Sequence, residues 1–169
     1  LINCILIAAL ALSVGLGVSL SRPTDDADNI TATTITTPTS HSPSHRCFAD
    51  RNELKAVVDR YVKEGCGTGA TLCRDLSDTY GWPMGSWCVI DVTDMSSLLK
   101  GLDAFNEDIS MWNVSQVTDM SYMFAEAGTF NRDLSSWNVS SVTNMSYMFE
   151  HGTSFNQNLC AWQDNFPYS

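Results

Sequence analysis

The sequence predicts an α/β repeat solenoid, in which each coil contributes one short parallel strand and one short helix, with a helical cap at the N-terminal end. Two observations carry this prediction. Tryptophan recurs every 25 residues with no insertion or deletion, at Trp87, Trp112, Trp137 and Trp162. A helical, cysteine-bearing segment precedes the first repeat, and a stack of repeats needs such an element because its terminal coil otherwise leaves an apolar face uncovered.

Residues 1–20 form an apolar segment with no charged side chain before Arg22. A helix of that length spans about 30 Å, the thickness of the hydrocarbon core of a bilayer. Two interpretations stay open, a membrane anchor and a secretory signal that is cleaved. Both predict that the residues that follow leave the cytosol. Because Leu1 is not a starting methionine, we also expect the natural chain to begin earlier.

Residues 21–46 contain 11 serines and threonines and 3 prolines in 26 positions. Such a segment cannot bury enough apolar surface to offset the cost of ordering the chain, which predicts a disordered stalk. An O-glycosylated spacer and a plain linker both fit this composition. Asn29 begins an N-glycosylation sequon, Asn-Ile-Thr.

Residues 47–86 are predicted to form the helical cap. Apolar residues recur there at the spacing of one face of an amphipathic helix, and they are Leu54, Val57, Val58, Tyr61 and Val62. Asp50 and Glu53 match a capping pattern at the start of this helix, and Gly65 supplies a stop. A second helical stretch is expected near residues 71–79.

Residues 87–169 are predicted to form the repeat array, and the units 112–136 and 137–161 are identical at 14 of 25 positions. An L-x-x-W-x-V pattern predicts a strand that points its last Trp and Val inward. The later Met-x-x-Met-Phe spacing, behind Thr118, predicts a short helix. The period lies in the range of leucine-rich repeats, whose coils bury their apolar faces only against their neighbours. The expected repeat core is Trp87, Trp112, Trp137, Trp162, Met120, Met145, Phe130 and Phe155.

The blocks WNVSQVTDMSYMFAEAGTFNRDLSS and WNVSSVTNMSYMFEHGTSFNQNLCA resemble the repeat of the BspA-like surface proteins. That repeat was first catalogued in mycoplasmas as a domain of unknown function. The resemblance covers the chain from Cys47 to about Ser169. It implies an exported, leucine-rich-repeat-like surface protein, of a family linked in some bacteria to adhesion, and it brings no catalytic residues.

Four cysteines surround the expected cap, namely Cys47, Cys66, Cys73 and Cys88. They allow three pairings in an oxidising compartment. We favour a local Cys66–Cys73 bridge and a Cys47–Cys88 bridge that ties the cap to the first strand. A zinc site built from the four thiolates is the alternative, although the chain has no C-x-x-C pair.

Cys160 is the remaining cysteine of the folded region. It lies nearly three coils from Cys88, and at about 5 Å per coil that is beyond the reach of a disulfide. We therefore expect the natural chain to continue past Ser169 with a segment whose cysteine bonds Cys160.

Three further sequons lie in the repeats, at Asn113, Asn138 and Asn144. The predicted strands expose Asn113 and Asn138, so that glycans there would cover the sheet face. The alternative for all three is an asparagine that hydrogen-bonds the backbone.

Asp108 and Asp133 recur one period apart, which is a spacing that catalysis could use. A glycosidase needs two carboxylates about 5–10 Å apart, one of them with a raised pKa. The third copy is Asn158, however, and recurrence at one repeat position is typical of a turn. Calcium bound by the oxygens of stacked turns is a further alternative. We predict no catalytic, cofactor-binding or metal site.

The chain carries 19 acidic and 9 basic residues, and its net charge of −10 argues against binding to nucleic acid. We expect a non-catalytic cell-surface protein whose ectodomain serves recognition or adhesion. Its ligand would be an unknown protein or glycan, and residues 1–20 would hold it at the membrane. A secreted structural or wall-associated repeat protein is the alternative, and a carbohydrate-active enzyme is the third possibility.

Overall fold

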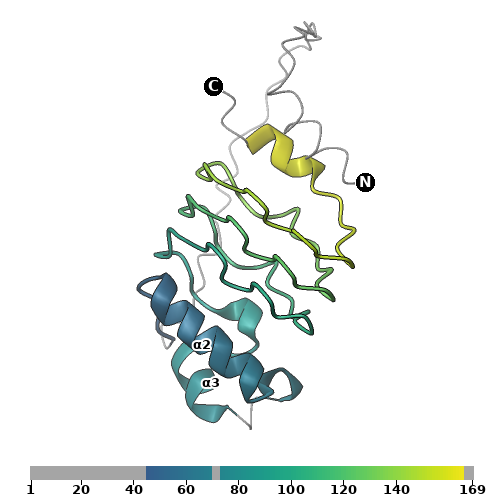
Figure 1. The fold of residues 1–169 in the computed structure, drawn as a ribbon. Coiled ribbons are helices and arrows are strands. Elements are labelled where there is room, and N and C mark those ends of the chain that lie inside the picture. The colour runs from purple at the N-terminus through teal and green to yellow at the C-terminus, as the bar shows by residue number, and fades with distance from the viewer. Residues whose placement is uncertain (1–44, 70–72, 166–169) are drawn as a thin grey trace, which may run out of the picture.

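The structure is a computed structural model that describes residues 45–69 and 73–165. Residues 1–20, predicted as a membrane anchor or signal, and residues 21–44 of the predicted stalk lie outside the described residues. Helices α2 (Arg51–Lys63) and α3 (Arg74–Tyr80) lie at one end of a stack of coils, and the 3₁₀ helix η3 (Cys160–Asn165) lies at the other (Figure 1). Two shorter 3₁₀ helices are η1 (Cys66–Thr68) and η2 (Met84–Ser86).

The helix predicted behind Asp50 is confirmed as α2, and its start is a reciprocal cap. The Glu53 N–H donates to Oδ1 of Asp50 at 2.9 Å, and the Ala49 N–H donates to Oε2 of Glu53 at 2.9 Å. Such a pair satisfies two N–H groups that the first turn of a helix leaves without partners. The chain then turns at Gly65, whose φ of 68° is the left-handed conformation that glycine adopts at no steric cost.

The apolar face of α2 is narrower than the sequence predicts. Leu54, Val58 and Tyr61 are buried against the rest of the fold, whereas Val62 is 36% exposed. Val62 lies near the end of the helix, where a cavity separates α2 from the first repeat. The spacing therefore placed Val62 on the correct side of the helix but beyond the edge of the core.

The segment before α2 joins the helical end to the first repeat. The Phe48 N–H donates to the carbonyl oxygen of Cys88 at 2.9 Å, and Nε of Arg51 donates to the carbonyl oxygen of Ser96 at 2.7 Å. The Phe48 ring stacks on Tyr80 of α3, with ring centroids 4.2 Å apart. A single cluster of buried residues runs from Phe48 to Trp162, so the helical end and the repeats share one core.

Consecutive 25-residue units lie side by side and exchange backbone hydrogen bonds. The Met95 N–H donates to the carbonyl oxygen of Asp119 at 2.8 Å, and one unit later the Met120 N–H donates to that of Asn144 at 2.8 Å. Two isolated parallel bridges, Asp94–Asp119 and Asp119–Asn144, mark this contact. Within residues 45–69 and 73–165 the pairing is too short to form a named strand.

The short helix predicted behind Thr118 does not form, and a run of tight turns takes its place. The Met123 N–H donates back to the Met120 carbonyl at 3.2 Å, but the N–H of the preceding residue, Tyr122, donates to Ser146 of the next coil at 3.0 Å. Every second backbone N–H in this segment therefore points toward the neighbouring coil. A helix would direct all of them along its own axis and leave the neighbouring coil without these bonds.

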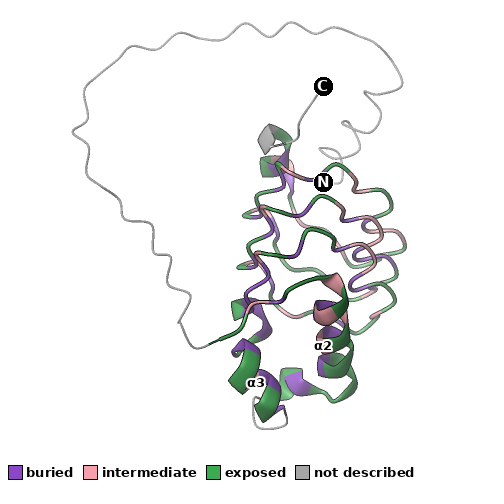
Figure 2. Cartoon of the chain, turned by 90° about the vertical axis from the view of Figure 1, so that its left-hand side faces the viewer, coloured by how far each residue is buried: buried purple, intermediate pink, exposed green. Residues whose placement is uncertain are grey.

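Buried and exposed residues alternate along each coil (Figure 2). The inward residues include a column of tryptophans, because Trp87, Trp112, Trp137 and Trp162 are all buried. Met120 and Phe130 are buried too, whereas Met145 and Phe155 are only partly buried. The last two belong to unit 137–161, which has a described neighbouring unit on only one side.

Candidate recognition surface

Two disulfides fasten the helical end of the fold. Cys47 is bonded to Cys88, 41 residues later, and Cys66 is bonded to Cys73 across a separation of 7 residues. These are the two pairings that the sequence favours. The first bridge joins the segment before α2 to the first repeat, and the second joins η1 to the start of α3.

Cys160 is disulfide-bonded as well, and none of the described cysteines is free. Its partner is none of the four cysteines above, because those are bonded to one another. The disulfide at Cys160 therefore forms without a segment past Ser169, contrary to the sequence prediction.

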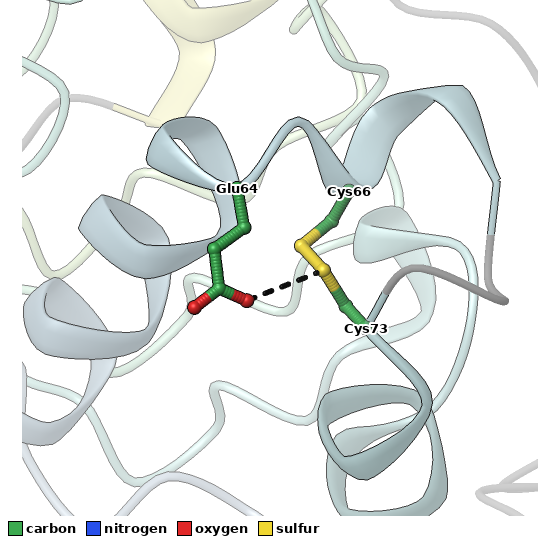
Figure 3. Close-up of side chains that lie close together, drawn as sticks. All are labelled: Glu64, Cys66 and Cys73. Carbon is green, nitrogen blue, oxygen red and sulfur yellow. Dashed lines mark hydrogen bonds between the residues drawn. A yellow bond between two sulfur atoms is a disulfide. The ribbon is translucent and has the colours of Figure 1, made fainter.

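The described part of the chain contains one group of three side chains of metal-binding type whose potential ligand atoms all lie within 4.8 Å of one another. These side chains are Glu64, Cys66 and Cys73. Both sulfurs are bonded to each other, however, so neither is the thiolate that a metal requires (Figure 3). Oε2 of Glu64 lies 3.7 Å from Sγ of Cys73. A disulfide sulfur carries no proton to donate, and this approach is a contact and not a hydrogen bond. The same reasoning removes the zinc alternative, because all four of its thiols are in disulfides.

The recurring acidic residues form turns. Oδ1 of Asp108 accepts the N–H of Ser110 at 3.0 Å, and Oδ1 of Asp133 accepts that of Ser135 at 2.9 Å. Asn158 accepts from Cys160 in the same way, at 3.0 Å, which explains why Asn can replace Asp there. Hydrogen bonds from Ser110 lower the pKa of Asp108, the opposite of what a general acid needs.

A polar hollow of about 430 Å³ opens beside these turns. It is lined by Asp108, Ser110, Asn131, Arg132, Asp133, Ser136 and Gln157. Hydrogen bonds link the asparagines of consecutive coils along one wall of the hollow. The Asn131 N–H donates to Oδ1 of Asn106 at 3.1 Å, and the Asn156 N–H donates to Oδ1 of Asn131 at 3.0 Å. The hollow offers hydrogen-bonding groups of both kinds and no aromatic surface.

Two tyrosines that the sequence analysis did not single out form an aromatic column at the surface, in which Tyr122 is half-buried and Tyr147 is exposed. The rings of Tyr122 and Tyr147 stack with centroids 5.0 Å apart and planes 18° apart, and Nζ of Lys100 lies 5.0 Å from the centroid of Tyr122. Tyr147 is 59% exposed. Both tyrosines have positive φ, 56° and 59°, which is unusual for a bulky side chain. Their recurrence in the motif Ser-Tyr-Met-Phe was the available signal.

The sequons of the repeats differ in their surroundings. Asn113 and Asn138 are exposed, and their Oδ1 atoms accept the N–H groups of Ser115 and Ser140. Asn144 is half-buried, and its Nδ2 donates to Oδ2 of Asp119 at 3.0 Å. Asn29 lies outside the described residues.

Two further properties of the protein are its charge and the character of its helices. Between Trp87 and Trp162 the chain has 9 acidic and 2 basic residues. In the part of the chain that the structure describes, no helix combines the length and apolar character needed to cross a membrane.

Comparison with known proteins gives one family and no individual relative. No curated protein and no solved structure matches the chain. The model of a family described as "Mycoplasma protein of unknown function, DUF285" matches residues 73–166, more than half of the chain. The match begins at Cys73, before α3, and extends through all three 25-residue units into η3. The chain therefore belongs to the DUF285 family.

Proposed function

We propose that this protein is a non-catalytic cell-surface protein of the BspA-like type, whose repeats recognise or adhere to a protein or glycan ligand. The observation that carries the proposal is the stacked pair of half-buried Tyr122 and exposed Tyr147 on a scaffold of hydrogen-bonded coils. Aromatic side chains supply large contact areas at a small loss of conformational freedom, and they are enriched at the centres of binding surfaces.

The proposed fold class is a leucine-rich-repeat-like solenoid with a helical cap. The gap-free period, the hydrogen bonds between consecutive units and the continuous core support it. The observed coils depart from the usual form of that class in having isolated bridges and turns in place of strands and helices. In place of such elements, the backbone N–H groups that face the neighbouring coil link each coil to the next.

The proposed location is outside the cytosol. Disulfides form and persist in oxidising compartments, and the described residues contain two, one local and one that joins residues 41 positions apart. The apolar residues 1–20 would then act as an anchor or as a cleaved signal. A secreted structural or wall-associated protein is the second candidate, which the same disulfides favour equally.

Location is tested with the full-length chain carrying an epitope tag at its C-terminus and produced in a secreting eukaryotic host. A membrane-impermeant biotin reagent should label the protein on intact cells, and the labelled protein should remain in the cell pellet. Labelled protein in the medium alone would favour the secreted alternative. Labelling only after permeabilisation would contradict both.

Recognition is tested with beads that carry the full-length protein and with intact cells of the same host. The double variant Tyr122→Ser, Tyr147→Ser should reduce bead adhesion. The matched control is Met111→Ser, because Met111 is 84% exposed and lies outside the tyrosine column. Equal adhesion of the double variant and the control would show that the tyrosine pair is not the recognition surface.

A further inference from the structure

A second cavity, of about 420 Å³, lies between the end of α2 and the first repeat. It is lined by Tyr61, Val62, Gly65, Gly67, Thr68, Ala104, Phe105, Asn106 and Glu107. It shares no lining residue with the polar hollow or the tyrosine column. The proposed function makes no use of it.

The hydroxyl of Tyr61 is the first sign that this cavity takes a ligand. Tyr61 is only 3% exposed, and its hydroxyl oxygen is buried with no hydrogen-bond partner among the described residues. Burial first, then the charge of Glu107 and the approach of its carboxylate to the hydroxyl, raise the pKa of Tyr61, so the group stays a neutral hydroxyl. That approach falls short of the geometry of a full hydrogen bond, which leaves the hydroxyl unsatisfied. A buried hydroxyl without a partner destabilises a fold, and such groups are rare unless something outside the chain satisfies them.

The carboxylate of Glu107 is the second sign. Glu107 is half-buried, and no Lys, Arg or His of the described residues forms an ion pair with it. Its carboxylate lies over Gly67, where any side chain would collide with it, and a Cβ at that glycine would be 3.6 Å from the Tyr61 hydroxyl oxygen. The acid of Glu107 and the hydroxyl of Tyr61 therefore meet at the same wall of the cavity.

The remaining lining restricts the chemistry of the ligand. Oγ1 of Thr68 already donates its proton to the Gly65 carbonyl at 3.0 Å, and Oδ1 of Asn106 already accepts from Asn131. Thr68 can therefore offer only lone pairs. Val62, Ala104 and Phe105 supply apolar surface. A negative carboxylate repels an anion, and a single carboxylate beside apolar walls is a poor site for a divalent cation, which needs several oxygen ligands.

We infer that this cavity binds a primary alkylammonium group. The ammonium would donate to Glu107 and to the oxygen of Tyr61, while the Tyr61 hydroxyl donates to Glu107. The alkyl stem would lie against Val62 and Phe105. Because no ion pair holds Glu107, its side chain can rotate and open the Tyr61 hydroxyl to the ligand. The Tyr61 hydroxyl, which lacks a full hydrogen bond, and the Glu107 carboxylate, which lacks an ion pair, would then be satisfied together.

Two sources of an alkylammonium group exist, a free amine and a lysine side chain of a partner. The probe for the first is n-butylammonium chloride, with n-butanol as its neutral control. The probe for the second is a short peptide with one internal lysine, compared with the same peptide acetylated on the lysine Nε. Acetylation removes the charge and leaves the stem.

The test follows backbone amides of the ¹⁵N-labelled full-length protein by NMR during these titrations. We expect saturable shifts at Gly65, Gly67 and Thr68 with n-butylammonium and none with n-butanol. Saturation by the lysine peptide at much lower concentration than by n-butylammonium would identify a partner's lysine as the source. Saturation by n-butylammonium alone would identify a free amine. No saturable shift with either amine would show that the cavity holds only water and would overturn the inference.

Three variants test whether binding occurs at this cavity. Glu107→Gln should weaken binding about tenfold, the loss expected for one charge-assisted hydrogen bond. The matched control is Asp108→Asn, which removes the same charge from the next residue and should weaken binding by no more than about twofold. Tyr61→Phe should also weaken binding, while its melting temperature stays at or above that of the parent because the lost hydroxyl had no partner. Equal losses for Glu107→Gln and Asp108→Asn, or unchanged binding to Tyr61→Phe, would overturn the inference.

Discussion

The indole N–H of Trp137 donates to the carbonyl oxygen of Ile109 at 3.1 Å, across 28 residues of sequence. The same bond joins Trp112 to Met84 at 2.9 Å and Trp162 to Leu134 at 2.9 Å. A buried tryptophan needs a partner for its one polar group, and here each coil supplies that partner to the next. The tryptophan column therefore holds the stack together by packing and by hydrogen bonds at once.

Truncation of this column should destabilise the whole stack. We expect Trp137→Ala to lower the free energy of unfolding by about 3–5 kcal/mol, the usual range for a buried aromatic side chain. Trp112→Ala should behave alike. Urea denaturation measures both, with Met111→Ala as an exposed control. A loss below about 1 kcal/mol would mean that the column is not the centre of the core.

The helical end and the repeats should unfold as one cooperative unit, because one buried cluster spans both. A chain that begins at Trp87 should melt at a lower temperature and less sharply than one that begins at Cys47, since it lacks α2, α3 and the Cys47–Cys88 bridge. Circular dichroism during heating gives both transitions. Two transitions of equal midpoint and width would contradict this prediction.

The two disulfides should contribute unequally to stability. Their loops differ in length, with sequence separations of 41 and 7 residues. Chain entropy alone predicts about 4 kcal/mol for the Cys47–Cys88 bridge and about 2.5 kcal/mol for the Cys66–Cys73 bridge. Denaturant unfolding of the two double serine variants, each with the other bridge intact, tests the order. The reverse order would mean that contacts near η1 outweigh loop closure.

Tyr61 should make the fold sensitive to alkaline pH. Burial raises the pKa of Tyr61 above its usual range in the folded state, so the unfolded chain loses the proton first. The stability from this group is complete below the unfolded pKa of about 10 and falls as the pH rises above it. Between pH 9 and about pH 11.5, Tyr61→Phe should lose less stability than the parent. The matched control is Tyr147→Phe at the exposed position, which should follow the parent.

Local sequence was sufficient for the start of α2 and for the repeat register. The reciprocal bonds of Asp50 and Glu53 involve residues four or fewer positions apart, so the sequence pattern contains all the partners. The repeat register can be predicted from the sequence equally well, because each coil presents the same residues to its neighbour. Trp112 and Trp137 occupy equivalent places and make equivalent bonds.

The prediction of a short helix behind Thr118 was wrong, and the reason is physical. Met120, Met123 and Phe124 have helical spacing and are buried, but a run of turns buries the same residues. What separates the two structures is the direction of the N–H groups. In the turns, the Phe124 N–H bonds Met148 of the next coil at 2.8 Å, a partner that no local pattern contains.

The sequence by itself determined the period, the tryptophan column, the first helix and the pairs of cysteines most easily bridged. Those features depend on near neighbours or on identical units, whose side chains repeat with the chain. Only the tertiary structure decided that the buried Tyr61 hydroxyl is left without a full hydrogen bond. Tyr61 and Glu107 lie 46 residues apart and differ in their surroundings, yet they meet at one cavity wall because α2 packs beside the first repeat. Burial and desolvation result from that packing, and they cannot be predicted from a residue pattern.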